Sequence, residues 1–311
     1  MPTIIVASQH PQAGRTTIIA GLGALLSDQG RSIRLARLRS SEGTDSGAED
    51  DARLLASVPG CTASATAVTE QDALVLARDA GETGILLIEA PAGAANQLAD
   101  RLSARVVLVA GDADDVLSAK SSLGDALTGV IATRVPGRRL DTLPAEIESQ
   151  GVPCLAVLPE DRLLGGPNVR EMADALHASR LVERGLEDEA VEYVMLGPIS
   201  ADPGQPYFLQ HGSKAVVNRF DKMDLHLAAL ATEPDCLILT GGQMPSPYLL
   251  DRVAGSDFDI TVLLAPEGTV RTVEVLDELF GSTRFAGQRK LTRAIELLRA
   301  RIDNDKLAAA L

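Results

Sequence analysis

The sequence is poor in several residue types, and each shortage excludes a class of protein. Its 311 residues include no tryptophan, three tyrosines and five phenylalanines, which leaves little material for an aromatic platform on which bases could stack. No apolar run approaches the ~18 residues that cross a bilayer, so no membrane association is expected. The three cysteines, Cys61, Cys154 and Cys236, are far apart and give no sign of a disulfide framework or a thiolate metal site.

Basic residues are also few. Lysine and arginine total 29 against 43 acidic residues, a net charge of −14. Such a surface repels nucleic acid phosphates on average, so no nucleic acid partner is expected, although one local basic face could bind a small phosphate-bearing compound. The N-terminal residues MPTIIVASQH lack a basic leader and a cleavage site. Together with the low cysteine content, they predict a cytoplasmic protein.

The first half of the chain alternates short apolar runs with segments of helical pattern. Nearly continuous apolar runs are typical of parallel strands that are covered on both faces. These runs lie at 4–7, 85–88, 106–110, 130–132 and 155–158. Helical patterns separate them at 17–27, 71–80, 115–127 and 143–150. This alternation predicts an α/β fold with a doubly wound, mostly parallel sheet, whose ligands bind at the carboxyl ends of the strands.

A second α/β domain follows. Residues 181–192 read LVERGLEDEAVE, an acidic stretch that suits a linker between a domain at 1–180 and a smaller one at 193–311. In the smaller domain, apolar runs at 215–217, 236–239 and 260–264 alternate with helical patterns at 223–231, 248–253 and 270–279. Near the C-terminus, Leu291, Ile295, Leu298 and Ile302 form one apolar stripe of a helix.

The segment 8–17, SQHPQAGRTT, lies between the first strand and the first helix, where a phosphate-binding loop would stand. Gly14 and Thr16 fit the P-loop pattern, in which backbone amides cradle phosphates and a hydroxyl holds Mg²⁺. Gln9 replaces the first glycine, and Arg15 stands where the lysine belongs. Arginine keeps the charge but brings a wider planar fork. A plain strand-to-helix turn is the alternative interpretation.

Two carboxylates strengthen the phosphate-site interpretation. Asp51 belongs to an acidic helix start, and Glu89 ends the apolar strand at 84–88. Carboxylates at such places complete the shell of a Mg²⁺ that also touches nucleotide phosphates. Helix-dipole complementation would equally explain Asp51, and an exposed strand end would explain Glu89.

With these motifs together, the chain resembles a known arrangement. Residues 1–180 resemble the dethiobiotin synthetase and cobyrinic acid amidase branch of P-loop proteins. The whole chain looks like the N-terminal regulatory part of long phosphotransacetylases, in which such a domain precedes a DRTGG domain. The resemblance rests on segments that span most of the chain, among them IIVASQHPQAGRTTIIAGLGALL, EDDARLL, ILLIEAPAG, GVIATRVP, LGPISADPGQPYF and LAALATEPDCLILTGG.

The resemblance implies a set of binding residues. Mg²⁺ would be held by Thr16, Asp51 and Glu89, while Arg15 and Arg37 stand in for two lysines of that family and Thr133 for its adenine-reading asparagine. The implied nucleotide contacts are Gly14, Arg15, Thr16, Thr17, Arg37 and Thr133.

The DRTGG signature is altered at residues 221–224, DKMD, while Thr240, Gly241 and Gly242 are intact. Because both stretches follow apolar strands that would be neighbours, the amides of Gly241 and Gly242 with Lys222 are expected to form an anion-attracting concavity.

Three functions remain open at this stage. The first is a regulatory protein that binds ATP, another nucleotide or a metabolite with Mg²⁺, has no more than weak NTPase activity, and pairs with an acyl- or acetyl-transfer enzyme. The second is an ATP- and Mg²⁺-dependent ligase or amidase-like enzyme. The third is a structural subunit without a ligand. A homodimer with the second domain at the interface is expected, since isologous dimers are the commonest soluble assembly.

Overall fold

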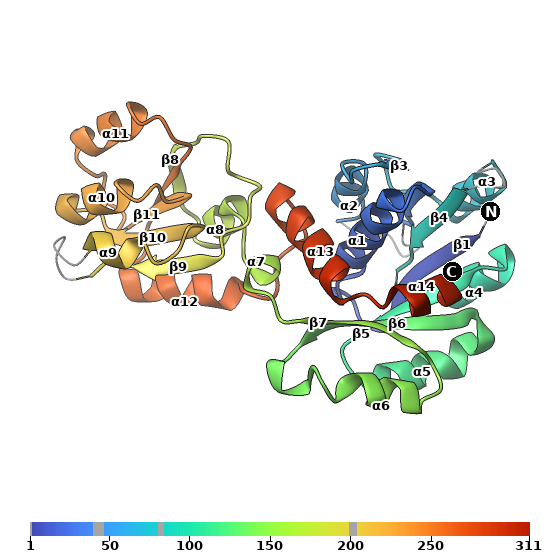
Figure 1. Ribbon diagram of the computed structural model, residues 1–311. Coiled ribbons are helices and arrows are strands. Elements are labelled where there is room, and N and C mark those ends of the chain that lie inside the picture. The colour runs from blue at the N-terminus through green and yellow to red at the C-terminus, as the bar shows by residue number, and fades with distance from the viewer. Residues whose placement is uncertain (1, 40–46, 80–83, 92, 199–203) are drawn as a thin grey trace. The chain divides into compact units, whose positions relative to one another are not determined.

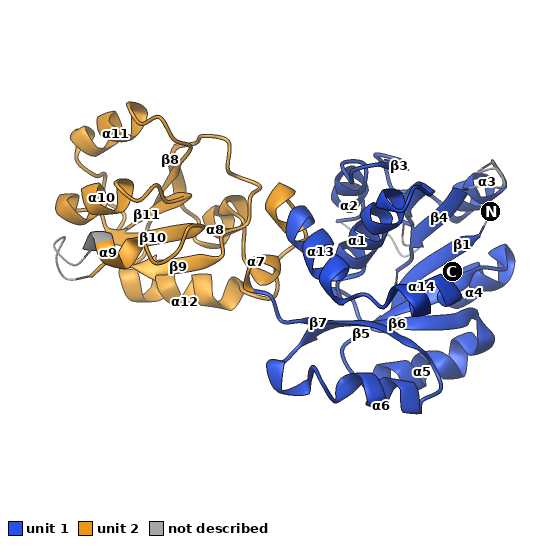
Figure 2. Cartoon of the chain, in the orientation of Figure 1, with its two compact units in different colours: residues 1–161, 291–311 blue, residues 162–290 orange. Residues whose placement is uncertain are grey.

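The protein folds into two compact units, each built around one α/β sheet. The structure, a computed structural model, describes residues 2–39, 47–79, 84–91, 93–198 and 204–311. The first unit comprises Met1–Asp161 and Leu291–Leu311, and the second comprises Arg162–Lys290 (Figure 2). In the described residues, no helix is long and apolar enough to cross a membrane.

The sheet of the first unit is parallel throughout. Its described strands follow the order β3-β2-β4-β1-β5-β6-β7. The strands are β1 (Thr3–Ser8), β2 (Ser32–Arg37), β3 (Cys61–Ala63), β4 (Gly84–Glu89), β5 (Arg105–Ala110), β6 (Leu127–Val135) and β7 (Cys154–Pro159). The chain places β2 and β3 on one side of β1, inserts β4 between β2 and β1, and then adds β5, β6 and β7 in order on the other side. The predicted doubly wound sheet is therefore confirmed, with its switch point beside β1.

Helices cover both faces of this sheet (Figure 1). The helical elements are α1 (Arg15–Asp28), α2 (Ala48–Leu55), α3 (Glu70–Asp79), α4 (Ala95–Leu102), α5 (Ala113–Leu123), α6 (Leu143–Ser149) and the short turns η1 (Gly124–Ala126) and η2 (Gly137–Arg139). Residues of α4, α5 and α6 share one buried cluster with alternate residues of the strands, such as Ile5 and Leu108. Helix α1 lies on the opposite face, and its apolar sequence is buried nearly all round.

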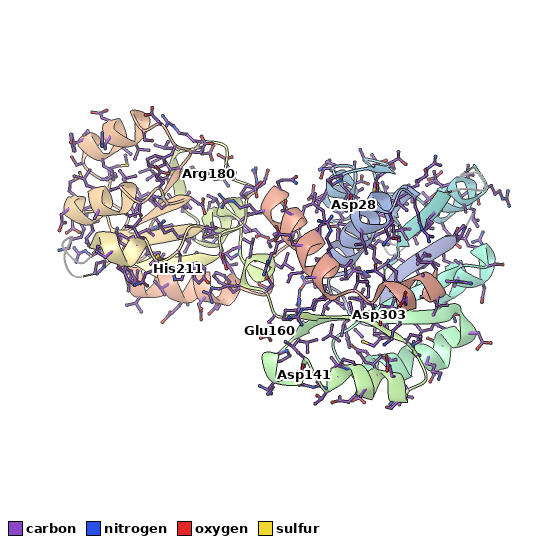
Figure 3. The ribbon with its side chains drawn as sticks, in the orientation of Figure 1. Asp28, Asp141, Glu160, Arg180, His211 and Asp303 are labelled. Atoms are coloured by element: carbon purple, nitrogen blue, oxygen red, sulfur yellow. The ribbon has the colours of Figure 1, made fainter. Side chains whose placement is uncertain are left out.

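The C-terminal residues return to the first unit. Helix α13 (Gln288–Arg301) carries the predicted apolar stripe, with Leu291 and Leu298 buried, and α14 (Asn304–Ala310) follows it. Asp303, labelled in Figure 3, caps α14 with its side chain, and its amide donates to the carbonyl of Leu155 in β7 (2.8 Å). The Thr128 hydroxyl of β6 also donates to the carbonyl of Ala310 (3.0 Å).

The second unit has a smaller mixed sheet with the described order β8-β12-β11-β10-β9, in which only β8 is antiparallel. The strands are β8 (Ser179–Val182), β9 (Tyr193–Leu196), β10 (Lys214–Arg219), β11 (Cys236–Thr240) and β12 (Thr261–Ala265). The helices are α7 (Arg162–Gly165), α8 (Val169–Ala175), α9 (Gly204–Phe208), α10 (Met223–Leu230), α11 (Pro247–Ala254) and α12 (Thr269–Leu279). One buried cluster lies on each face of the sheet.

The unit boundaries differ from the division predicted at 180 and 193. Residues 162–180 belong to the second unit, and residues 291–311 belong to the first. Residues 181–192, predicted to be a linker, are part of the folded second unit, because Val182 pairs with β12 and Ala190 forms a β-bridge with Asn168. Its acidic composition reflects an edge strand and surface turns, which sequence composition alone does not distinguish from a linker.

A tight turn before α8 offers a test of packing in the second unit. A Cβ on Gly166 would lie 2.3 Å from the Val191 carbonyl oxygen, a backbone atom that cannot rotate away. We expect Gly166→Ala to lower the free energy of unfolding by about 1–3 kcal/mol in urea titrations. Gly212→Ala is the control, because nothing lies within 4 Å of its added carbon. Equal stabilities of the two variants would contradict this packing.

Candidate functional site

The loop between β1 and α1 ends in an uncapped helix. Gly14 is the N-cap of α1, has φ 95° in the left-handed region, and offers no side chain to the first turn. The amides of Thr16 and Thr17 lack intrahelical acceptors, as in any first helical turn. The first turn also contains no acidic residue. This end of α1 therefore presents amide donors and the positive end of the helix dipole at the carboxyl edge of the sheet.

Arg15 turns back toward β1. Its guanidinium donates from one terminal nitrogen to the Ser8 hydroxyl (2.9 Å), and its Nε lies 3.6 Å from Glu89 Oε1. The Ser8 hydroxyl in turn donates to the His10 carbonyl (2.6 Å). Only 10% of the Arg15 side chain is exposed. Arg15, which stands at the P-loop lysine position, therefore links the start of α1 to β1 through Ser8 and to β4 through Glu89.

A buried carboxylate sits at the centre of the site. Glu89 ends β4 and is 1% exposed. Its Oε1 accepts a hydrogen bond from the Thr16 hydroxyl (3.1 Å) and lies 3.3 Å from Arg37 Nε. Arg37 Nε also donates to Asp51 Oδ2 (3.2 Å), at the start of α2. The three residues predicted to hold Mg²⁺ thus come together, with the Arg37 guanidinium bridging two of them.

The sheet register explains this meeting. Arg37 on β2 and Glu89 on β4 are directly paired neighbours in the parallel ladder. Side chains of paired residues on adjacent strands project from the same face of the sheet, so the Arg37 guanidinium and the Glu89 carboxylate lie next to each other. Helix α1 brings Thr16 to the same point, and α2 brings Asp51.

Burial dominates the electrostatics of Glu89. Loss of water raises the pKa of its carboxyl to about 7, and Asp51 adds to this rise, while Arg37, Arg15 and the Thr16 hydrogen bond work in the opposite direction. Its Oε2 atom is buried without a hydrogen-bond partner in the described part of the chain. The carboxylate therefore keeps one unused acceptor atom that faces protein.

The donor set is chemically apt for Mg²⁺, but the arrangement is not. Mg²⁺ requires oxygen ligands at octahedral positions close around the ion. Here the Arg37 guanidinium stands between the Asp51 and Glu89 carboxylates. In this arrangement Thr16, Asp51 and Glu89 do not fit a bound Mg²⁺.

The remaining predicted residue of the first unit supports the loop. Thr133 occupies the position that the resemblance implies for the adenine-binding residue, and it is buried. Its hydroxyl donates to the Ala13 carbonyl (2.8 Å) and thereby holds the loop between β1 and α1. The contact between His10 Nε2 and Asp115 Oδ1 (3.0 Å) was not predicted from the sequence. Asp115 Oδ2 accepts from the Gly111 amide (3.0 Å) as well. Acidic residues in the first turn of α5 were the available signal.

In the second unit the glycine amides are already used. The Gly241 amide donates to the Glu267 carbonyl (2.8 Å), and the Gly242 amide donates to the Ala265 carbonyl (3.0 Å). Both glycines have positive φ, 101° and 67°, so they shape a turn between β11 and α11. Lys222 is exposed at the start of α10. The expected concavity of two glycine amides and Lys222 is therefore not formed, because backbone carbonyls take both amides.

Most of the second unit matches a known domain family. Residues 171–279 match the family described as the DRTGG domain. The chain carries a DRTGG domain. The matched residues lie within the second unit, from α8 to the end of α12.

The other similarities are partial. The chain is 27% identical over 202 residues to a phosphate acetyltransferase of Nitratidesulfovibrio vulgaris, and the match covers 60% of this chain but 28% of that protein. The CBS and DRTGG domains of Clostridium perfringens pyrophosphatase, solved with the activator diadenosine tetraphosphate, align with a TM-score of 0.34 and 13% identity over 41% of this chain and 56% of that chain. MinD of Aquifex aeolicus aligns with a TM-score of 0.39 and 14% identity over 53% and 84% of the two chains. At these TM-scores the structural likenesses carry no functional argument.

The DRTGG domain has a pocket at the carboxyl edge of its sheet. Its volume is about 530 Å³, and α12 begins in it without a side-chain cap. The pocket includes Gly241 but neither Gly242 nor Lys222. Its cationic side chains are Arg219 and Arg271, which pair with Asp221 and Glu274 respectively.

The buried Glu89 predicts a pH dependence of stability. A pKa raised from 4.5 to about 7 means that the folded state holds this proton more tightly. The resulting stabilisation is fully present below about pH 4.5 and is lost as the pH rises through about 7. In urea titrations from pH 5 to 8, the wild type should therefore lose stability relative to Glu89→Gln.

The control for this titration is Glu160→Gln, an exposed glutamate of the same unit that is labelled in Figure 3. It should follow the wild-type pH profile throughout. Parallel profiles for the wild type and Glu89→Gln would contradict a raised pKa.

Proposed function

We propose that this chain is a regulatory protein whose first unit binds ATP, another nucleotide or a related phosphate-bearing metabolite at the loop between β1 and α1. The observation that carries the proposal is the uncapped N-terminus of α1, next to the buried guanidinium of Arg15. Backbone amides at a helix N-terminus and a neighbouring cation are the recurring elements of phosphate binding. We also propose that the first unit shares its ancestry with dethiobiotin synthetases.

A regulatory role suits the site better than a catalytic one. Phosphoryl transfer depends on groups that hold the outer phosphates and stabilise the charge that develops there. The Arg15 guanidinium is engaged with Ser8 and Glu89, and Arg37 is engaged with Asp51 and Glu89. Neither is arranged to follow a transferring phosphoryl group. We therefore expect binding with little or no hydrolysis.

The proposed partner is an acetyl- or acyl-transfer enzyme. The partial match to a phosphate acetyltransferase and the presence of a DRTGG domain support this choice. In this view, ligand binding in the first unit is communicated to a transferase through the DRTGG domain.

Nucleotide binding can be tested with two matched glycine variants. Gly14 and Gly30 both have positive φ, 95° and 80°, and no atom lies closer than 3.9 Å to the carbon added at either. Alanine costs about 1–2 kcal/mol at either site through backbone strain. Only Gly14→Ala should also weaken ATP binding, by about tenfold in calorimetric titrations, or ~1.4 kcal/mol.

Phosphate release measured on the same samples should stay at the buffer background. Equal ATP affinities of the two variants would contradict binding at this loop. Robust hydrolysis by the wild type would favour the enzyme hypothesis.

We also propose a homodimer formed through the DRTGG domain. Five of the seven large hydrophobic side chains exposed in the described residues belong to this domain, with Met244 and Tyr248 each about 60% exposed. Light scattering of the full chain should give twice the 32.6 kDa chain mass. The double variant Met244→Asp/Tyr248→Asp should give the monomer mass.

Leu117→Asp is the matched control, since Leu117 is also a large exposed hydrophobic residue (54%) but belongs to the first unit. It should leave the dimer intact. A monomeric wild type, or dissociation by Leu117→Asp alone, would remove the DRTGG domain from the interface.

A further inference from the structure

Arg37 occupies the point at which the predicted metal ligands meet. Its Nε lies 3.2 Å from Asp51 Oδ2 and 3.3 Å from Glu89 Oε1. The same Glu89 oxygen accepts the Thr16 hydroxyl hydrogen. The Arg37 side chain is 3% exposed, and one of its terminal nitrogens donates to the Leu38 carbonyl (2.5 Å), which fixes the direction of the guanidinium.

The charges of this cluster leave nothing for a divalent cation. With both carboxylates ionised, Arg15 and Arg37 balance Asp51 and Glu89, and the sum is zero. With Glu89 protonated, the sum is positive. In the absence of a phosphate-bearing ligand, a divalent cation would have to enter a neutral or positive site that is largely closed to water, and burying an uncompensated charge is costly.

The cluster is also held in place by the fold. Arg37 and Glu89 are paired in the β2–β4 ladder, so the guanidinium cannot leave the carboxylate without a change of its own rotamer inside the core. A guanidinium expelled toward solvent would leave the buried Glu89 with only the Thr16 hydroxyl at 3.1 Å and Arg15 Nε at 3.6 Å as partners. Displacement of Arg37 by Mg²⁺ would therefore require the loss of buried ion pairs as well as dehydration of the ion.

We propose that the Arg37 guanidinium replaces the divalent cation of this site, so that a phosphate-bearing ligand binds at the N-terminus of α1 without Mg²⁺. The ligand part of this inference rests on the proposed function. The exclusion of the metal does not, because it follows from Arg37, Asp51 and Glu89 alone.

Manganese provides a direct test that requires no nucleotide. In electron paramagnetic resonance titrations with Mn²⁺, the full-length wild type should show no high-affinity site. Arg37→Gln leaves the Asp51 and Glu89 carboxylates without their shared cation and should bind one Mn²⁺ at least tenfold more tightly than the wild type.

Arg34→Gln is the control for charge alone. It removes the same charge from the same strand, β2, but Arg34 is paired in register with Leu86 rather than with Glu89. This variant should not gain Mn²⁺ affinity. Circular dichroism verifies that each variant is folded. If Arg37→Gln does not fold, the wild type still decides: one tightly bound Mn²⁺ overturns the proposal, and its absence supports it.

The second arm measures ATP binding to the wild type by calorimetry, once in EDTA and once in MgCl₂. Affinities within twofold of each other support metal-independent binding, and an affinity at least tenfold higher with Mg²⁺ overturns it. Absence of ATP binding in both buffers would defeat the proposed function. The Mn²⁺ titration would then still decide whether Arg37 excludes the metal.

Discussion

Neutralisation of the buried Glu89 carboxylate is the constraint on which the first unit depends. A carboxylate with 1% exposure is stable in the interior only when cations and donors surround it. Those partners come from two elements, Arg37 from β2 and both Arg15 and Thr16 from the first turn of α1. Asp51 of α2 joins the cluster through its contact with Arg37. The position of the loop, the start of α1 and the start of α2 are thereby coupled to one charge.

The helices that begin at the carboxyl edges of the two sheets differ in whether a side chain caps their N-terminal amides. The side chain of Asp112 caps α5 by accepting from the amides of Asp114 and Asp115. The DRTGG glycines give their amides to backbone carbonyls. Helices α1 and α12, in contrast, begin at glycine N-caps that lack a side chain. Anion binding at a helix N-terminus requires such unused donors, and this requirement separates α1 from a capped helix at the same sheet edge.

An acidic protein that binds anions needs local positive charge. The net charge of −14 repels phosphates at long range, where salt also screens it. Near α1, where Arg15 and Arg37 balance the carboxylates of Asp51 and Glu89, the positive end of the helix dipole acts at short range. The proposed preference for a small phosphate-bearing ligand over nucleic acid rests on this contrast, because a polyanion must face the whole acidic surface.

Five strands of the first unit's sheet and the members of the site could be predicted from the sequence. Uninterrupted apolar runs identified β1, β4, β5, β6 and β7, because strands buried on both faces need apolar residues at every position. Strands β2 and β3 escaped notice, since Arg34 and Arg37 interrupt one apolar run and the other strand has only three residues. The resemblance to P-loop synthetases implied that Thr16, Asp51 and Glu89 would meet, and Glu89 does contact Thr16 directly and Asp51 through Arg37.

What these residues do where they meet depends on three-dimensional packing. The Arg37 guanidinium lies between the carboxylates because β2 and β4 pair in one particular register, which no local pattern specifies. The return of α14 onto β6 and β7 likewise depends on contacts between residues more than a hundred positions apart, such as Thr128 and Ala310. Side-chain direction and long-range pairing are products of packing, and composition or periodicity along the chain does not encode them separately.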